Sequence, residues 1–416
     1  MRVLAAIVAP PHLALGGAAR AAEQLSAALA AHCDITVASM MAPQLGSDGA
    51  LPRAELRTFL PPGLPWSRVP NRYRTPFYRS DLPRLVASGA YDLVHLHNPM
   101  PALAMAAIAK ACRKAGVPYL VSTHGFNEIA NGERVYGFGL VRRAAWRVLI
   151  SQPLERVVRG AAAVLGLSPA DEQIVRRMGF GGRFALAPNG VPPATPSDSI
   201  RDEKIWARIG IPEPGPGTIT CMFLANHTPN KGLPILLEAF AGLDRPFTLI
   251  VGGEKRPEID YSAAKQLRPD QRIVITGRLV DDDLGALFRR ADLFVFPTLA
   301  DTFPLVVLEA MAHGLPVVAS SVGGIPYQID EGCGRLVEAG DVPGLRRAVE
   351  AMADDPEGRR AMGARAKVRA ASHFTWEHAA ELAYAEYERV LAPSRVGVLP
   401  ISDSAQSQVG TLANAR

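Results

Sequence analysis

The sequence predicts an α/β protein built from two Rossmann-like, doubly wound domains. Short apolar strands alternate with amphipathic helices, and this pattern restarts after a Pro- and Ser-rich segment at residues 190–199. A chain of 416 residues is also longer than one hydrophobic core usually holds. Near-continuous apolar strands separated by helices are typical of a parallel sheet covered on both faces. We therefore expect ligands to bind beyond the C-terminal ends of the strands, in a cleft between two sheets.

The individual elements follow from the same periodicity. In the first half, strands are predicted at residues 1–8, 33–39, 91–97, 118–124 and 162–168, with helices such as 18–32 and 102–116 between them. In the second half, strands are predicted at 218–225, 247–253, 272–277, 293–298 and 316–320, with helices at 232–243, 281–291 and 304–314. The predicted domains cover 1–194 and 195–374. A last amphipathic helix follows at 375–392, capped by Thr375. Residues 393–416 carry few apolar groups and are predicted to form a disordered tail.

Composition narrows the classes of function. The net charge of +5 suits anionic small molecules or an anionic membrane surface, and no clustered basic motif points to nucleic acid. Cys33, Cys112, Cys221 and Cys333 lie far apart without a CxxC pair, which favours a reducing cytoplasm over a disulfide framework or a metal site. No uninterrupted apolar stretch is long enough to span a bilayer.

The strongest chemical signal lies in the segment LFVFPTLADTFPLVVLEAM. A strand is followed by a loop that carries Asp301, and then by a helix with Pro304 predicted at its first position. The free amides of Leu305 and Val306 at the start of this helix form an anion site. Glu309, about one turn later, can accept hydrogen bonds from the vicinal hydroxyls of a ribose. The alternative is an ordinary βαβ unit with a solvent-exposed glutamate.

This segment resembles the acid-x7-acid signature of family 4 retaining glycosyltransferases, with Asp301 and Glu309 as the two acids. Weaker matches follow in the same order along nearly the whole chain. They are a Gly-Gly pair at 16–17, HLH at 95–97, THG at 123–125, APNGV at 187–191, TPNKG at 228–232 and the terminal helix. The resemblance implies a GT-B architecture in which the terminal helix, 375–392, crosses back onto the first domain.

The resemblance also implies an activity and a set of site residues. The activity is metal-independent, retaining transfer of a hexose from a nucleotide-diphosphate sugar to a hydroxyl of a glycan, lipid-linked or small-molecule acceptor, without a cofactor. The residues implied in catalysis are His124, Lys231 and Asp301. Those implied in donor binding are Gly16, Gly17, Asn226, Lys231, Gly277, Phe303, Leu305, Val306 and Glu309. Within these sets, Lys231 neutralises the diphosphate, Glu309 binds the ribose, and His124 and Asp301 lie beside the sugar.

One departure from the family pattern bears on activity. Asn226 stands five residues before Lys231, where such proteins usually have an arginine, so a neutral amide replaces a bidentate cation. Weaker phosphate neutralisation, compensation by His227 and an altered donor are all consistent with this change. So is a non-catalytic nucleotide-sugar-binding protein that keeps the fold. An oxidoreductase is disfavoured because no GxGxxG follows the first strand.

Two polar clusters have structural interpretations. His95 and His97 alternate on a strand and are predicted to point to opposite faces, in structural roles. The three aspartates at 281–283 resemble a metal motif, but they directly precede a predicted helix, so helix capping is favoured over metal binding.

Two segments of the first domain, 68–80 and 135–160, interleave arginines with aromatic or apolar residues. In the second of these, Val141, Ala145 and Val148 form an apolar stripe at helical spacing. Peripheral contact with an anionic membrane surface is one interpretation. The other is that the stripe packs on the sheet and the arginines are solvated or bind a soluble anionic acceptor.

Overall fold

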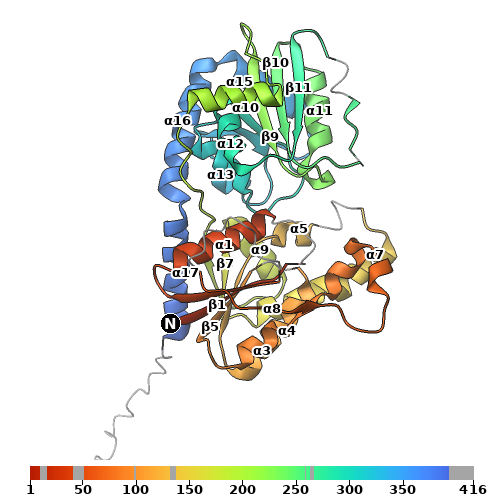
Figure 1. Ribbon diagram of the computed structural model, residues 1–416, viewed down its shortest axis with the longest axis vertical. Coiled ribbons are helices and arrows are strands. Elements are labelled where there is room, and N and C mark those ends of the chain that lie inside the picture. The colour runs from red at the N-terminus through yellow and green to blue at the C-terminus, as the bar shows by residue number, and fades with distance from the viewer. Residues whose placement is uncertain are drawn as a thin grey trace, which may run out of the picture.

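The chain folds into two α/β domains, each built around a parallel six-stranded sheet (Figure 1). The computed structural model describes residues 1–9, 16–40, 51–97, 100–131, 137–257, 259–262 and 267–392. The tail predicted over 393–416 therefore lies outside the described residues. No helix within these ranges is long and apolar enough to cross a bilayer.

The first sheet has the strand order β2-β1-β5-β6-β7-β8. Its strands are β1 (Arg2–Ile7), β2 (Asp34–Ser39), β5 (Leu93–His97), β6 (Tyr119–Ser122), β7 (Ala163–Gly166) and β8 (Arg183–Leu186). A small antiparallel pair, β3 (Thr58–Phe59) and β4 (Arg79–Ser80), forms separately. The sequence did not predict β8. This strand is short, lies at the sheet edge and is only partly buried, so its sequence lacks a continuous apolar run.

The second sheet has the strand order β11-β10-β9-β12-β13-β14, which is the Rossmann order. Its strands are β9 (Ile219–Leu224), β10 (Phe247–Gly252), β11 (Gln271–Gly277), β12 (Leu293–Phe296), β13 (Val317–Ser320) and β14 (Gly334–Val337). The edge strand β14 was not predicted, for the same reason as β8. The order reverses between β9 and β12, and ligands of such sheets bind at this switch point.

Helices cover both sheets. In the first domain they are α1 (Gly17–Leu29), α2 (Asn71–Arg74), α3 (Leu82–Ala87), α4 (Ala102–Ala115), α5 (Phe126–Ala130), α7 (Leu140–Trp146), α8 (Gln152–Arg159) and α9 (Pro169–Arg177). In the rest of the chain they are α10 (Ser199–Ile209), α11 (Leu233–Ala241), α12 (Asp281–Arg290), α13 (Leu305–Ala312), α14 (Ile325–Gln328), α15 (Val342–Asp354), α16 (Pro356–His373) and α17 (Trp376–Leu391).

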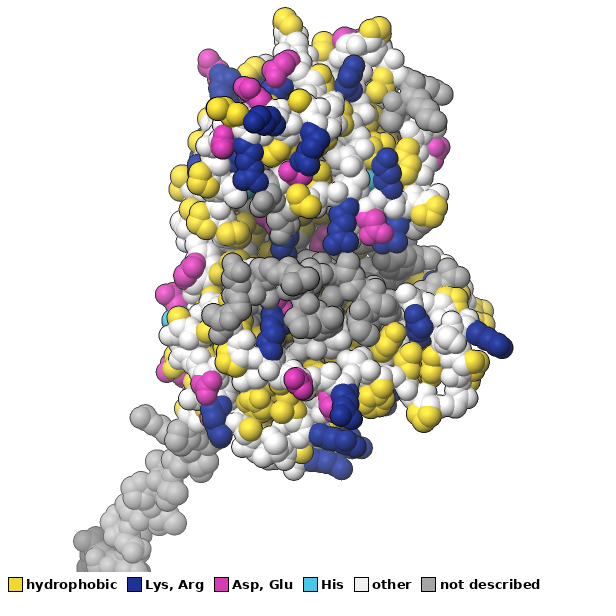
Figure 2. All heavy atoms as spheres, in the orientation of Figure 1, with side chains coloured by type: hydrophobic (Ala, Val, Ile, Leu, Met, Phe, Trp, Pro, Cys, Tyr) yellow, Lys and Arg dark blue, Asp and Glu magenta, His cyan; other side chains and the backbone are white. Residues whose placement is uncertain are grey.

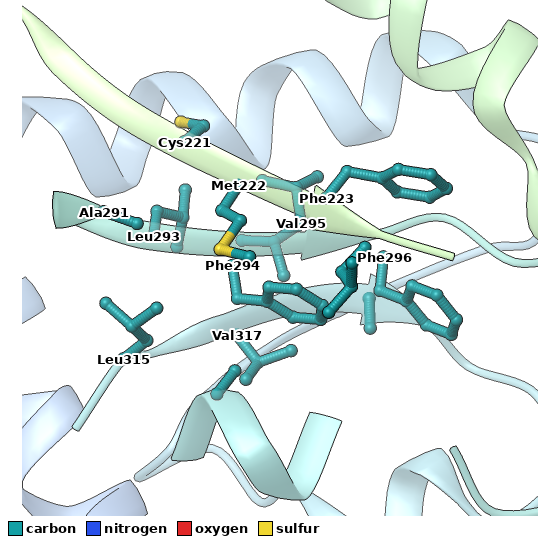
Figure 3. Close-up of a cluster of buried hydrophobic side chains, with 14 of the residues drawn as sticks. Cys221, Met222, Phe223, Ala291, Leu293, Phe294, Val295, Phe296, Leu315 and Val317 are labelled. Atoms are coloured by element: carbon teal, nitrogen blue, oxygen red, sulfur yellow. The ribbon is translucent and has the colours of Figure 1, made fainter. Parts of the chain in front are cut away.

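Aromatic packing fixes the ends of β9 and β12 in the second domain (Figure 3). The rings of Phe223 and Phe296 stack with centroids 6.0 Å apart, and Phe296 stacks on Phe294 at the same distance. All three side chains are almost completely buried. The loops that follow these two strands carry Lys231 and Asp301, so the core packing holds their starting points in place.

The terminal helix α17 packs on the first domain, where Figure 1 shows it running beside α1. Trp376 and Tyr387 share a buried cluster with Val3 and other residues of β1. Glu386 accepts a hydrogen bond of 2.8 Å from Arg183 of β8. The predicted cap is confirmed, because Thr375 accepts a hydrogen bond from the amide of His378 at 3.1 Å.

The hinge between the domains passes close to the start of α17. A Cβ atom at Gly190 would lie 2.2 Å from the amide nitrogen of Trp376, so any larger residue would push the two segments apart. The amide of Val191 also donates to the carbonyl of Phe374 at 2.8 Å. The close approach of the two backbones therefore gives the Asn-Gly pair a structural role at the hinge.

The prediction that His95 and His97 point to opposite faces is wrong. Their ring centroids lie 3.8 Å apart. Side chains alternate along a strand with a period of two, so residues two apart share a face, and Leu96 points to the other one. His95 Nδ1 lies 2.6 Å from the hydroxyl of Tyr387 in α17, and the ring centroid of His97 lies 5.7 Å from that of His124.

At two helix starts, the residues do not have the roles that were predicted for them. Pro304 is the N-cap of α13, not its first helical residue, because its ψ of 120° is extended. Helix α12 begins at Asp281 itself, and Val280 holds the N-cap position. The predicted aspartate capping is therefore wrong at that position. Asp283 instead pairs with Arg208 of α10 at 2.7 Å.

Candidate active site

One cavity of about 490 Å³ lies between the domains, at the C-terminal ends of both sheets. Most of the predicted site residues line it, namely Gly16, Gly17, His124, Asn226, Lys231, Asp301, Phe303, Leu305, Val306 and Glu309. Gly277 is the exception. Its neighbours Arg278 and Leu279 line the cavity in its place. The fold thus gathers residues from both halves of the sequence into one site.

Two helix N-termini open onto this cavity, one from each domain. Gly16 is the N-cap of α1 and Pro304 is the N-cap of α13, and neither helix start has a side-chain cap or an acidic residue in its first turn. The first amides of a helix have no intrahelical acceptor, and the helix dipole favours an anion there. Among the residues that the structure describes, none lies within 4 Å of a Cβ atom built at Gly17, so these residues leave space for a ligand beside this amide.

Lys231 is positioned by a short 3-10 turn, Pro229–Lys231, that follows β9. The carbonyl of Asn230, in the same turn, accepts hydrogen bonds from Leu299 N at 2.7 Å and Thr298 Oγ1 at 2.8 Å. These contacts tie the turn to the loop after β12. Lys231 Nζ lies 2.5 Å from Asp301 Oδ2, so the predicted diphosphate cation and the predicted sugar-binding acid form an ion pair.

The first domain holds the Asp301 loop from the other side of the cleft. Asn127 of α5 donates through Nδ2 to the carbonyl of Asp301 at 2.6 Å. Its backbone amide donates to Thr302 Oγ1 at 3.1 Å. The position of Asp301 therefore depends on how the two domains meet, which sequence reasoning did not anticipate.

Glu309 lies one turn into α13, as predicted, with its side chain 18% exposed. Arg20 of α1 approaches it from the first domain, with a guanidinium nitrogen 3.7 Å from Glu309 Oε1. Phe303 also borders the cavity, but its ring packs edge-on against Phe374 at 5.9 Å. Phe303 therefore contributes more to the packing of the loop than to the open surface of the cavity.

His124 is a buried, neutral group at the wall of the cavity. Its exposed fraction is 1%, and this burial lowers its pKa to about 4. Within the described ranges its Nε2 has no hydrogen-bond partner. A neutral imidazole can donate or accept a hydrogen bond, according to its tautomer, so His124 suits a sugar hydroxyl.

His227 does not compensate for the neutral Asn226. It is fully buried, and its ring nitrogens lie 2.8 Å from the hydroxyl of Tyr261 and 3.3 Å from the carbonyl of Gly252. Burial is also the main reason why its pKa lies below the ordinary value. His227 is therefore a neutral structural group at neutral pH.

Sequence reasoning did not assign to the site the polar lining residues Arg20, Asn189, Thr228, Glu254, Arg278 and Thr302, nor Asn127 beside the cavity. Arg20 follows the Gly-Gly pair by one helical turn, and Arg278 follows Gly277 directly, so their proximity to predicted residues was a usable signal. Asn127 carried no local signal, because its contacts are with residues about 175 positions away.

Comparisons with known proteins agree with this geometry. Residues 15–195 match the model of Glycosyltransferase Family 4, and residues 218–355 match that of Glycosyl transferases group 1. The chain is 28% identical over 318 residues to 2-deoxystreptamine glucosyltransferase of Streptomyces kanamyceticus, covering 73% of this chain and 79% of that protein. It is 28% identical over 333 residues to D-inositol 3-phosphate glycosyltransferase of Thermobifida fusca, covering 74% and 72%.

The fold is similar to that of solved glycosyltransferases. Sucrose-phosphate synthase from Thermosynechococcus elongatus superposes with a TM-score of 0.71 at 20% identity, covering 94% of this chain and all of that one. Anabaena HepE, solved in complex with UDP-glucose, superposes with a TM-score of 0.66 at 19% identity, covering 93% and 99%.

Two Rossmann-like domains that face each other across one cleft define the GT-B class of glycosyltransferases, and this chain has that architecture. Within the class, the chain belongs to family 4.

Proposed function

We propose that this glycosyltransferase moves a hexose from a nucleotide-diphosphate sugar to a hydroxyl of its acceptor, with retention of anomeric configuration. The observation that carries this proposal is the convergence of Lys231, Glu309 and two uncapped helix N-termini on one interdomain cavity. A diphosphate needs cations and amides, and a ribose needs a hydrogen-bond acceptor. The names of the relatives and the UDP-glucose complex of HepE support a donor of this kind.

The chemistry needs stabilisation of the leaving group. The bond between the sugar C1 and the diphosphate oxygen breaks, a bond from the acceptor oxygen to C1 forms, and the proton of the acceptor hydroxyl passes to an oxygen of the departing diphosphate. Negative charge develops on the departing diphosphate, and Lys231 with the amides of Leu305 and Val306 can stabilise it. We propose that these groups make a divalent cation unnecessary.

The acceptor site belongs to the first domain in this proposal. Helix α7 carries an apolar surface in which Val141 is 83% exposed and Val148, just beyond the helix, is 59% exposed. The predicted stripe therefore does not pack on the sheet. Figure 2 shows hydrophobic and basic side chains side by side on the projection that carries α7. This combination favours contact with an anionic membrane surface, and hence an acceptor that is lipid-linked or close to the membrane.

A non-catalytic nucleotide-sugar-binding protein is the second candidate, and Asn226 is the observation that favours it. The two candidates differ in turnover. A panel of UDP-, GDP- and ADP-sugars first identifies the donor by thermal shift, since a ligand at a hundred times its Kd stabilises the fold by about 2.7 kcal/mol. The enzyme hydrolyses or transfers the sugar of that donor, whereas the binding protein only binds it.

The same assay tests metal independence and retention. With EDTA in excess, turnover stays unchanged, and NMR of the first product formed shows the anomeric configuration of the donor. The variant Lys231→Ala loses turnover, while Lys204→Ala, which removes an exposed lysine of α10 outside the cavity, does not. An absolute requirement for Mg²⁺ or Mn²⁺ contradicts the first claim, and an inverted product contradicts the second.

A further inference from the structure

Arg20 reaches into the donor cavity from the first domain. It lies in the first turn of α1, three residues after the first helical residue, Gly17. Its side chain is 37% exposed and lines the cavity. The guanidinium nitrogen that lies 3.7 Å from Glu309 joins an element of the first domain to the proposed ribose-binding residue of the second. The cationic group of Arg20 is therefore already inside the site where a donor would bind.

The cavity has few cations with which to hold a diphosphate. Among the described residues that line it, the cationic ones are Arg20, Lys231 and Arg278. Asn226, which also lines the cavity, is neutral. Lys231 contributes one positive charge at the β9 end of the cavity, whereas a diphosphate carries more than one negative charge. A second cation near the helix N-termini is therefore needed for efficient neutralisation.

The position of Arg278 makes it less suitable for this task. It follows β11, and β10 separates that strand from β9, after which Lys231 is placed. Neighbouring strands lie about 4.8 Å apart, so the two strand ends are separated by about 10 Å. Arg20, by contrast, is in contact with Glu309, on the helix whose first amides form the proposed anion site.

We infer that Arg20 is the second cation for the donor diphosphate, and that it is supplied by the first domain in place of a cation at Asn226. This inference rests on the proposed function. Four of the charged groups that line the cavity are paired, Lys231 with Asp301 and Arg20 with Glu309. A donor exchanges these partners. Its diphosphate takes the two cations, and its ribose and hexose hydroxyls take the two carboxylates. The guanidinium can bind phosphate oxygens in a bidentate manner, which a lysine cannot do.

The test compares ligands that differ only in the number of phosphate groups. Calorimetry measures binding of the nucleoside, the nucleoside monophosphate and the nucleoside diphosphate of whichever base the wild type prefers. For Arg20→Gln, we expect the affinity for the diphosphate to fall about tenfold or more, the size of one charged hydrogen bond. The affinity for the bare nucleoside stays the same or rises, because Arg20 no longer competes with the ribose for Glu309.

Three further variants make the result specific to this site. Arg278→Gln removes a cation from the same cavity and leaves the preference for diphosphate over nucleoside within about twofold of the wild type, as expected for a group remote from the phosphates. Adding Asn226→Arg to Arg20→Gln restores at least part of the diphosphate affinity. Arg20→Lys keeps the positive charge but cannot bind phosphate in a bidentate manner, so it gives an intermediate loss of diphosphate affinity. Thermal unfolding of each variant verifies that it is folded.

The outcomes separate the inference from the proposed function. If the wild type binds a nucleoside diphosphate and Arg20→Gln binds it equally well, the inference is wrong and the proposed function stands. If Arg20→Gln weakens nucleoside and diphosphate by the same factor, Arg20 only orients Glu309, and the inference is again wrong. If the wild type binds no nucleotide at all, the proposed function fails, and the inference fails with it.

Discussion

Lys231 Nζ lies 2.5 Å from Asp301 Oδ2, so two side chains that are 70 residues apart in sequence form an ion pair near the N-terminus of α13. A nucleoside diphosphate that enters the cavity competes with Asp301 for this lysine. The roles proposed for the two residues can therefore be separated by removing one charge at a time.

We predict that Lys231→Ala weakens binding of the nucleoside diphosphate about tenfold or more, since it removes a charged hydrogen-bond partner. Asp301→Asn leaves this affinity unchanged or raises it, because the charge of Asp301 no longer competes with the diphosphate for Lys231. The same variant lowers sugar transfer. Calorimetry and a transfer assay measure the two effects. Equal weakening of nucleotide binding by both variants would contradict the assignment of Asp301 to the sugar.

Glu309→Ala is expected to remove about 2–3 kcal/mol of nucleotide binding, the value for a charged hydrogen-bond partner. Comparing a nucleotide with its 2′-deoxy form isolates the contribution of the ribose 2′-hydroxyl. The wild type loses affinity when the hydroxyl is removed, whereas Glu309→Ala is nearly indifferent to it, because the two changes remove the same interaction. Glu238→Ala, an exposed glutamate of α11, is the matched control. If Glu309→Ala keeps the full preference for ribose over deoxyribose, Glu309 does not bind the ribose.

The buried histidines predict how stability depends on pH. Burial lowers the pKa of His95 to about 3 and that of His124 to about 4, and it holds the pKa of His97 well below the ordinary 6.5. Above pH 6.5 these rings are neutral in both the folded and the unfolded states. Below pH 6.5 the unfolded chain binds protons that the folded protein does not. The contribution to the free energy of unfolding is therefore complete above about pH 6.5 and is lost as the pH falls towards 4.

Asp171 opposes this trend over part of the same range. Burial raises its pKa to about 6 from 3.8, so between these values the folded protein holds the extra proton and gains stability as the pH falls. The three histidines outweigh the one carboxyl, so these four groups together make the free energy of unfolding rise with pH between roughly pH 4 and 6. Urea unfolding at a series of pH values measures this slope.

The variant His97→Leu isolates one of these groups. Within the described ranges, neither ring nitrogen of His97 has a hydrogen-bond partner, so the variant is expected to be at least as stable as the wild type at pH 7.5. Its pH slope is smaller by about 1.4 kcal/mol per unit, the value for one proton. An unchanged slope would show that His97 takes up its proton equally in both states.

The exposed surface of α7 predicts binding to membranes. Wild-type protein is expected to co-sediment with vesicles that contain anionic lipid, and to dissociate as salt is raised, since each basic residue near the surface contributes about 1 kcal/mol. Combining Arg143→Ser and Arg147→Ser weakens this binding, and Val141→Ser weakens it further. Arg360→Ser, on α16 of the second domain, leaves it unchanged. If the wild type does not bind anionic vesicles at low salt, the acceptor is a soluble molecule.

Much of the fold could be predicted because its signals are local. Apolar runs at the spacing of strands identified the central strands of both sheets, where burial on two faces demands such runs. The edge strands β8 and β14 were missed because they are short and partly exposed, whereas the longer edge strands β2 and β11 were predicted. The place of Glu309 one turn into a helix followed in the same way from local spacing.

The sequence by itself determined the two-sheet α/β architecture and the helix N-terminus that carries Glu309 from local patterns, and it determined the family from motifs that follow in order along the chain. The tertiary structure decided the rest. Only the packing of one domain on the other brings Arg20 to Glu309 and Asn127 to Asp301. Only burial makes His124 and His227 neutral, and only the outward position of α7 exposes Val141. The physical reason is that charge, protonation and exposure depend on neighbours from distant parts of the chain, which no local pattern specifies.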